Sequence, residues 1–280
     1  MVVDRKTRII QRIAIWSGIA VLLFWSLGPI YWVVVTSLKR SKEIYSFPPT
    51  LYPHVFTLSN FYDALFKWDF PRFIYNSSVI AVSVTLLSIV IAALAAYPIA
   101  RLQFPGRKMS ARAIIASYLL PPSLLFIPLF LVLFRLGLID SKLGLIVAYL
   151  TFTVPFCTWL LVGYFRTIPF ELDEAALIDG ASRAQILRRV ILPIALPGLA
   201  VVALYAFTNA WNEFLYALVY VNSADAKTFT AGLAGLMMGD TFIWGQLMAS
   251  SVIAILPVLV IYLVAQRYLV EGLAAGSVKT

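Results

Sequence analysis

The sequence predicts an all-α integral membrane protein with six transmembrane helices, on the grounds of its composition and its hydropathy pattern. Of its 280 residues, 61% are hydrophobic and 12% are charged, and the mean hydropathy is +0.90. These values lie far from those of soluble globular domains. A helix needs about 20 mainly apolar residues to cross about 30 Å of hydrocarbon. Six stretches meet this requirement: residues 13–37, 74–97, 111–135, 143–165, 195–221 and 244–266.

The first apolar stretch is predicted to be a membrane span and not a signal peptide. Basic residues precede it, as they would in a signal peptide: Arg5, Lys6, Arg8 and Arg12. From Ile13 to Val35, however, it is longer than the apolar region of a signal peptide, and no small-residue cleavage site closes it. Because six spans leave little chain for anything else, residues 1–280 are predicted to form a single transmembrane domain.

The third apolar stretch carries prolines that should interrupt it. The run Leu119-Leu120-Pro121-Pro122 lies in its first half and Pro128 in its second. Proline removes a backbone donor and clashes with the preceding turn of a helix. A kink or a break in the helix predicted over residues 111–135 is therefore expected.

The distribution of basic residues between the loops predicts the orientation of the chain. With six crossings, both termini share one side with the loops near residues 98–112 and 166–193. That side carries 14 of the 22 Lys and Arg residues. We therefore expect the termini, including the tail 267–280, to be cytoplasmic. The net charge of +9 then reflects topology and attraction to lipid head groups, and no nucleic-acid-binding surface is expected.

The polar loop between the fourth and fifth spans is predicted to form a helical hairpin. Pro169 suits the first position of a helix, and three acidic residues follow it at the positive end of the helix dipole, namely Glu171, Asp173 and Glu174. The first helix should run from about residue 169 to residue 178. Gly180 then follows as a residue that adopts a positive φ without strain.

The second helix of the hairpin is expected to begin at Ser182. Ser182 and Gln185 have the spacing of a capping box, and Pro193 should end the helix. Short helices are marginal alone in water, so another surface must hold the first one. That surface is either the inner ends of the protein's own helices or a cleft on a soluble partner.

Nothing in the residue content favours a disulfide framework, a metal site or a catalytic cluster. The chain has one cysteine, Cys157, inside the fourth apolar stretch, and one histidine, His54, without neighbouring residues of a metal-ligating type. A membrane enzyme would need clustered His, Asp or Cys residues. The sequence also lacks the glycine-rich Gly-x-x-x-x-Gly-Lys-Ser/Thr motif that holds ATP phosphates.

The hairpin carries a family resemblance. Glu174-Ala175-Ala176, Asp179-Gly180-Ala181 and Ile191-Leu192-Pro193 together resemble the EAA loop of the inner-membrane permease subunits of binding-protein-dependent ABC importers. Other pieces fall in the order seen in the carbohydrate branch, the maltose transporter MalG-like subunits: Ser37-Leu38-Lys39, the run 96–102, Trp211-Asn212-Glu213-Phe214 and Gln266-Arg267-Tyr268. The resemblance covers nearly the whole chain.

The resemblance implies a type I importer permease of the cytoplasmic membrane of a bacterium or an archaeon. It would pair with a second permease as a heterodimer, dock on two ATPase subunits and receive solute from an extracytoplasmic binding protein. The chain itself would bind no cofactor and catalyse no reaction, because ATP and Mg belong to the partner ATPases. The loop 166–193 would be the coupling loop, with its contacts to the ATPase made by Glu174, Ala175, Ala176, Asp179, Gly180, Ala181, Ile191, Leu192 and Pro193.

The resemblance further implies a sugar, preferably a di- or oligosaccharide, as cargo. The same machinery importing glycerol phosphate or a polyol is the alternative, and a secondary transporter fits less well because no inverted repeat is found.

Glu213 is the only acidic residue clearly inside a predicted span, and such a carboxylate usually faces a wet cavity or a partner. Asn209 and Asn212 are expected near the same face of the fifth helix as Glu213. This face either lines the translocation path or, if Glu213 lies near the outer interface, fixes the packing between helices.

Overall fold

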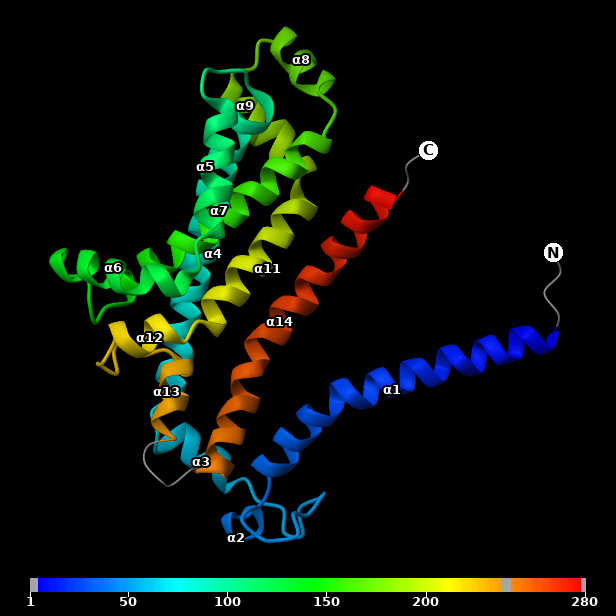
Figure 1. Ribbon diagram of the computed structural model, residues 1–280, viewed down its shortest axis with the longest axis vertical. Helices are drawn as coiled ribbons and strands as arrows, with labels where there is room; N and C mark the ends of the chain where they lie inside the picture. The colour runs from blue at the N-terminus through cyan, green and yellow to red at the C-terminus, as the bar shows by residue number, and fades with distance from the viewer. Residues whose placement is uncertain (1–4, 238–242, 278–280) are drawn as a thin grey trace. The chain divides into compact units, whose positions relative to one another are not determined.

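The computed structural model describes residues 5–237 and 243–277, and its regular structure within these ranges is entirely helical (Figure 1). The chain divides into two compact units. The first comprises Met1–Phe70 and Leu233–Ile255, and the second comprises Pro71–Gly232 and Leu256–Thr280.

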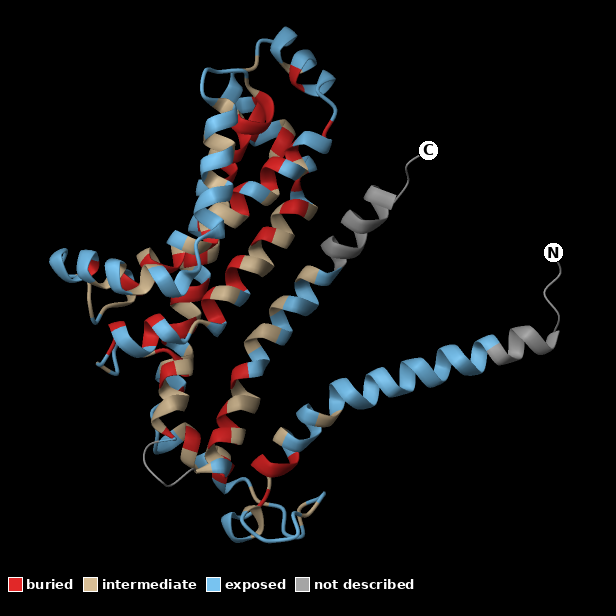
Figure 2. Ribbon diagram, viewed as in Figure 1, coloured by how far each residue is buried: buried red, intermediate tan, exposed pale blue. Residues whose placement is uncertain are grey.

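The first unit contains α1 (Arg5–Ser37), α2 (Ser41–Ile44), α3 (Ser59–Phe66) and the beginning of α14 (Trp244–Ser277). Most of the apolar surface of α1 is exposed within this chain (Figure 2). The buried Asn60 amide donates to the carbonyls of Ser37 at 2.9 Å and Lys39 at 2.8 Å, which are left without helical partners at the end of α1. This contact fixes α3 against the end of the first helix.

The second unit is built around α4 (Phe70–Arg101), α7 (Lys142–Thr167) and α11 (Leu196–Asn212). Buried residues line the helices of this unit (Figure 2). Its core is rich in small side chains, among them the fully buried Ala92, Ala96 and Ala206, and larger residues such as Leu161 and Phe165 complete it. Small residues let membrane helices approach closely, which strengthens their van der Waals packing.

Gly198 of α11 lies against the Tyr164 ring of α7. A Cβ atom built on Gly198 would lie 2.7 Å from Cγ of the Tyr164 ring, so only glycine fits there. The second unit also holds α5 (Arg107–Leu119), α6 (Pro122–Arg135), α12 (Leu215–Tyr220) and α13 (Phe229–Gly235).

Four helices are long and apolar enough to cross a membrane. They are Gln11–Ser37, Phe70–Arg101, Lys142–Thr167 and Trp244–Gln266, each containing most or all of one predicted span. Two bent pairs add to them: Arg107–Leu119 with Pro122–Arg135, bent by 96°, and Arg183–Ile194 with Leu196–Asn212, bent by 81°. The described residues therefore hold four such helices, or up to six if each bent pair is one span.

The third predicted helix, over residues 111–135, is broken as the prolines led us to expect. Leu120 and Pro121 have extended backbones between α5 and α6, and Pro122 begins α6. A residue that precedes proline is disfavoured in the α region, so two consecutive prolines separate the two helices.

The fifth predicted helix, over residues 195–221, is wrong as a continuous helix. It ends at Asn212 because Glu213 adopts an extended backbone, with φ −65° and ψ 131°, and α12 begins at Leu215. The Glu213 side chain accepts the first backbone N–H groups of α12, so it favours a new helix start over continuation. The boundary expected after residue 266 also does not end a helix, because α14 continues to Ser277; residues 278–280 of the predicted tail lie outside the described residues.

Candidate functional site

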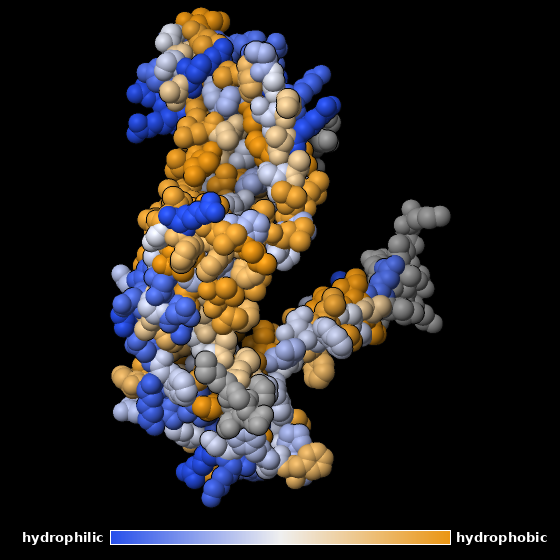
Figure 3. Space-filling view, turned by 60° about the vertical axis from the view of Figure 1, so that its left-hand side comes forward, coloured by the Kyte–Doolittle hydropathy of each residue, from blue (hydrophilic) through white to orange (hydrophobic). Residues whose placement is uncertain are grey.

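The predicted coupling loop, residues 166–193, contains four short helical segments at one end of α4, α5 and α7 (Figure 1). They are α8 (Glu171–Ile178), α9 (Arg183–Ile186), the π-helix η1 (Leu187–Ile191) and α10 (Leu192–Ile194). The first helix therefore begins at Glu171, two residues later than predicted. Polar side chains gather over this end of the second unit, whereas apolar side chains cover the helices beyond it (Figure 3).

The turn after α8 is closed by a Schellman motif. The N–H of Ala181 donates to the carbonyl of Ala176 at 2.9 Å, and the N–H of Gly180 donates to that of Leu177 at 3.0 Å. Gly180 has a φ of +78°, which confirms the prediction of a positive φ at this position.

The capping box predicted at the start of the second helix is also confirmed. The Ser182 N–H donates to Gln185 Oε1 at 2.7 Å, and the Gln185 N–H donates to Ser182 Oγ at 3.4 Å. The predicted end of this helix at Pro193 is wrong, since Pro193 lies inside α10 and the break follows at Ala195. A wide turn precedes the proline, in which the Leu192 N–H donates to the carbonyl of Leu187.

The sequence-predicted coupling residues separate into an outer and an inner group. Glu174, Ala175, Asp179 and Gly180 are exposed, whereas Ile191 is fully buried in the core under the loop. A shallow pocket of about 310 Å³ is lined by Ala176, Asp179, Gly180, Ala181, Gln185, Arg189 and Val190. The outer group therefore presents two acidic and two small residues to solvent, and Ile191, Leu192 and Pro193 connect that surface to α11.

Sequence reasoning missed the contact that holds the loop to the membrane helices. Arg101, the last residue of α4, and Asp173 of α8 are both buried, and they form an ion pair. The sequence places Asp173 only in the acidic first turn of the hairpin, and Arg101 only in the run 96–102 of the family resemblance. An acid on an otherwise exposed helix and an arginine closing an apolar span are the signals that could have paired them.

The three residues predicted to line a translocation path are brought to one pocket. A pocket of about 360 Å³ is lined by Pro122, Phe152, Thr208, Asn209, Asn212, Glu213, Phe214 and Tyr216. Their relation differs from the prediction, because Glu213 follows the end of α11 instead of extending its face. The pocket lies where the break in the third predicted span meets the break in the fifth, since the Tyr216 hydroxyl donates to the Pro122 carbonyl at 2.7 Å.

The Glu213 carboxylate is held by three donors. Oε1 accepts the N–H of Tyr216 at 2.9 Å, and Oε2 accepts the N–H of Ala217 at 3.1 Å and the Tyr149 hydroxyl at 2.7 Å. Hydrogen bonds to a carboxylate are stronger than those between neutral groups. The carboxylate thus caps α12 and ties it to α7, while the side chains of Asn209 and Asn212 offer amide donors and acceptors beside the aromatic Phe152, Phe214 and Tyr216.

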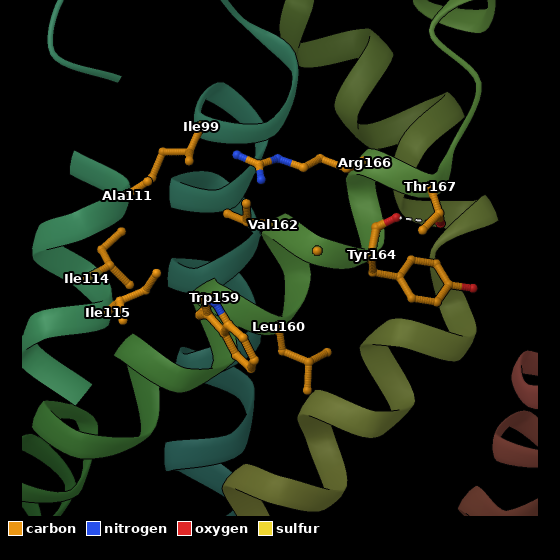
Figure 4. A pocket seen from close by; sticks show the side chains of 11 residues that line it. Ile99, Ala111, Ile114, Ile115, Trp159, Leu160, Val162, Tyr164, Arg166 and Thr167 are labelled. Atoms are coloured by element: carbon orange, nitrogen blue, oxygen red, sulfur yellow. Dashed lines mark hydrogen bonds between the residues drawn. The ribbon is translucent and has the colours of Figure 1, made fainter. Parts of the chain in front are cut away.

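A larger pocket, of about 460 Å³, lies between α4, α5 and α7. Ile99, Ile114 and Ile115 face Trp159 and Val162 across it, and the Arg166 side chain extends over one end (Figure 4). Its walls are mostly apolar, with Tyr164, Arg166 and Thr167 as the polar residues, so it offers little for recognising a polar solute. Among the described residues, no group of three or more His, Cys, Asp or Glu side chains could hold a metal ion.

The long apolar helices define an integral membrane protein, and comparison with known families identifies it as a transport component. Residues 77–274 match the family of binding-protein-dependent transport system inner membrane components. The chain belongs to this family and is a multi-pass protein of the cytoplasmic membrane, as its resemblance predicted.

Relatives match over nearly the whole chain. The inner membrane ABC transporter permease protein YcjP of Escherichia coli K12 is 37% identical over 274 residues, covering 97% of this chain and 98% of the relative. The trehalose/maltose transport system permease protein MalG of Thermococcus litoralis is 34% identical over 278 residues, covering 98% and 99%. A crystal structure of a bacterial ABC transporter that imports the acidic polysaccharide alginate shares the fold, with a TM-score of 0.81, 24% identity and coverage of 95% and 98%.

Proposed function

We propose that this chain is the permease subunit of an ATP-driven importer that moves a sugar, preferably a di- or oligosaccharide, across the cytoplasmic membrane. The observation that carries the proposal is the exposed coupling loop, whose EAA residues present acidic and small side chains at one end of the membrane helices. Relatives at 34% identity support the cargo, because they are named for the transport of trehalose and maltose, of diacetylchitobiose and of trehalose.

Six crossings with both termini in the cytoplasm are part of the proposal. Each bent pair would form one crossing, so that the four single helices and the two pairs together make six. The coupling loop would then lie on the side that carries most of the Lys and Arg residues.

The coupling loop would seat in a groove on a partner ATPase, which binds the ATP and Mg. The exposed Glu174 would face basic residues there, while Ala175, Ala176 and Ala181 would permit a close fit around the turn at Gly180. A second permease subunit would complete the membrane part as a heterodimer, and an extracytoplasmic binding protein would deliver the solute. The exposed apolar surface of α1 is suited to contact with lipid or with the second permease.

The polar pocket around Glu213 would line the sugar path. Asn209, Asn212 and Glu213 would bind hydroxyl groups, and the neighbouring aromatic rings would cover the apolar faces of the sugar. None of the pocket's lining residues is Lys or Arg, which disfavours glycerol phosphate because a phosphate needs a cation or a set of N–H donors. A neutral polyol stays as the alternative cargo.

The first experiment is to tag the chain, extract it from native membranes in mild detergent and identify its partners by mass spectrometry. We expect a second permease and two copies of an ATPase, with which ATP-dependent sugar uptake into proteoliposomes is then measured. Recovery of the chain alone or as a homo-oligomer, with no ATPase even after cross-linking, would contradict the proposal.

The coupling role is tested with Glu174→Lys. Reversing the charge should uncouple ATP turnover from uptake and leave membrane insertion intact, because Glu174 is exposed on the loop. Gly180→Pro should have a similar effect, since proline cannot adopt a φ of +78°. Normal uptake by either variant would show that the loop does not couple the two activities.

A further inference from the structure

Arg101 uses every N–H donor of its side chain within one small region. Its Nε donates to Asp173 Oδ2 at 3.0 Å, and its Nη1 donates to the carbonyls of Phe165 at 3.2 Å and Ile168 at 2.7 Å. Its Nη2 donates to the carbonyl of Pro169 at 2.9 Å and also to Asp173 Oδ2. A guanidinium has five N–H donors, so all five are satisfied here.

The acceptors belong to two elements that follow each other in the chain. Phe165 lies in the last turn of α7, Ile168 and Pro169 follow its end, and Asp173 lies on α8. The carbonyls at a helix end lack the full set of intrahelical partners and can accept hydrogen bonds from a side chain. The ring of Phe170 between them lies 4.9 Å from the guanidinium carbon. One side chain at the end of α4 therefore holds both the end of α7 and the coupling helix.

Stability alone does not account for this pair. Both side chains are almost fully buried, with 3% and 1% of their surface exposed, and burying two charges costs several kcal/mol per ion before their attraction offsets it. A well-packed apolar pair is often as stable as a buried ion pair. The ion pair differs from an apolar pair because hydrogen bonds are directional. Two of the five Arg101 hydrogen bonds reach Asp173 on α8, and the other three reach carbonyls at and just after the end of α7, so the side chain fixes the orientation of α8 relative to α4 and α7.

We propose that Arg101 joins α4, the end of α7 and α8 into one rigid body, so that movement of the coupling helix enters the membrane through α4 as well as through α7. The inference rests on the proposed function, because it assigns Arg101 a positioning role in energy coupling. Arg101 touches neither solute nor ATP in this scheme. It acts by preventing α8 from turning independently of the membrane helices.

Arg107 provides a matched control. It is also an arginine at the same end of the second unit, and it also donates to helix carbonyls, those of Ile99 at 2.7 Å and Ala100 at 3.1 Å. Both acceptors belong to α4, and neither lies on α8. A loss of coupling caused by breaking the Arg101 contacts should therefore be absent in Arg107→Ala.

The activity test uses the complete importer in proteoliposomes, with ATP hydrolysis and sugar uptake measured in the same sample. We expect Arg101→Ala to lower sugar uptake per ATP hydrolysed by about tenfold, a size typical of coupling between sites, while the complex stays assembled. Arg101→Lys should give a similar loss, because lysine keeps the charge but has three donors on a flexible stem. An unchanged ratio in both variants would overturn the inference.

A distance measurement tests rigidity without relying on activity. Spin labels are placed on the exposed Leu94 of α4 and Leu172 of α8, in a chain whose single, buried Cys157 is replaced by Ser. The distance between labels should be the same in the nucleotide-free and ATP-bound complex, and it should broaden or shift in Arg101→Ala but not in Arg107→Ala. If the distance changes between the two nucleotide states while Arg101 is intact, the inference is overturned, whatever the variants do.

The two readouts separate the inference from the function on which it rests. A complex with intact Arg101 that hydrolyses ATP but imports none of the tested sugars contradicts the proposed cargo. The distances between the spin labels then test by themselves whether Arg101 holds α4, the end of α7 and α8 as one rigid body. A complex that imports the normal amount of sugar per ATP hydrolysed when Arg101 is replaced supports the proposed function and contradicts the positioning role of Arg101.

Discussion

Glu213 shows how one side chain sets both the local backbone and the chemistry of the polar pocket. Glu213→Gln keeps the side-chain size but replaces one acceptor oxygen by a donor, which must then face the Ala217 N–H, the Tyr149 hydroxyl or the Tyr216 N–H. We expect reduced sugar uptake with ATPase docking retained. Tyr149→Phe removes a single hydrogen bond to the carboxylate and should destabilise the protein by about 1.5–3 kcal/mol, with a smaller loss of uptake. Equal uptake by Glu213→Gln and the unmodified protein would assign the carboxylate to packing alone.

Asp140, in the turn between α6 and α7, predicts an acid-sensitive contact. The N–H groups of Ser223, at 2.8 Å, and Asn222, at 2.9 Å, donate to its Oδ1 and hold its pKa below the ordinary 3.8. Because the pKa is lower in the folded state, the contact contributes stability above the ordinary value and loses it as the pH falls through the depressed pKa. Thermal unfolding at several acidic pH values should show this loss, and Asp140→Asn should reduce the dependence on pH. An identical pH profile for the variant would contradict the assignment.

At the scale of single residues, the sequence predicts local backbone features better than long-range partners. The positive φ of Gly180 and the Ser182–Gln185 capping box follow from residue types a few positions apart, and both are present. The pairing of Arg101 with Asp173 joins residues 72 positions apart, so it depends on how α4 packs beside α7. No local pattern encodes that packing. The pocket that Asn209, Asn212 and Glu213 share likewise depends on the tertiary structure. The sequence predicts these residues on one face of a continuous helix, but α11 ends at Asn212, before Glu213.

At the scale of helices, the contact between α7 and α11 limits the size of the side chain at position 198. In Gly198→Ala the new Cβ would lie within 3.0 Å of three atoms of the Tyr164 ring, so the ring or the helices must move. Overpacking of this kind typically costs about 1–3 kcal/mol. Gly163→Ala on α7 is the control, because its Cβ would meet nothing within 4 Å. Thermal unfolding in detergent should show a lower melting temperature for Gly198→Ala only. Equal melting temperatures for both variants would mean that the contact between α7 and α11 accommodates the methyl group without loss of stability.

The sequence predicts the extent of a helix well where hydrophobicity determines it, and poorly where a side-chain hydrogen bond determines the end of the helix. The stretches 13–37, 74–97 and 143–165 each lie within one helix, since twenty apolar residues suffice to define a span. The break near Pro121 was expected from proline chemistry. The break at Glu213 was not, because a carboxylate that caps a following helix has the same sequence signature as one on a continuous helix face.

At the scale of the whole molecule, the 96° bend between α5 and α6 decides the topology. If the pair crosses the membrane, the turn at Asp140 lies outside; if the pair forms a re-entrant segment, that turn lies in the cytoplasm. The side with 14 of the 22 Lys and Arg residues favours the crossing, because basic loops are retained in the cytoplasm.

We therefore expect alkaline phosphatase, which is active only outside the cytoplasm, to be active when fused after Asp140. A fusion after Asp69, which lies outside in either topology, is the positive control, and a fluorescent protein fused after Thr280 should fold in the cytoplasm. An inactive fusion at Asp140 beside an active one at Asp69 would make α5 and α6 a re-entrant pair, and it would require the coupling loop and the polar pocket to be assigned to new sides of the membrane.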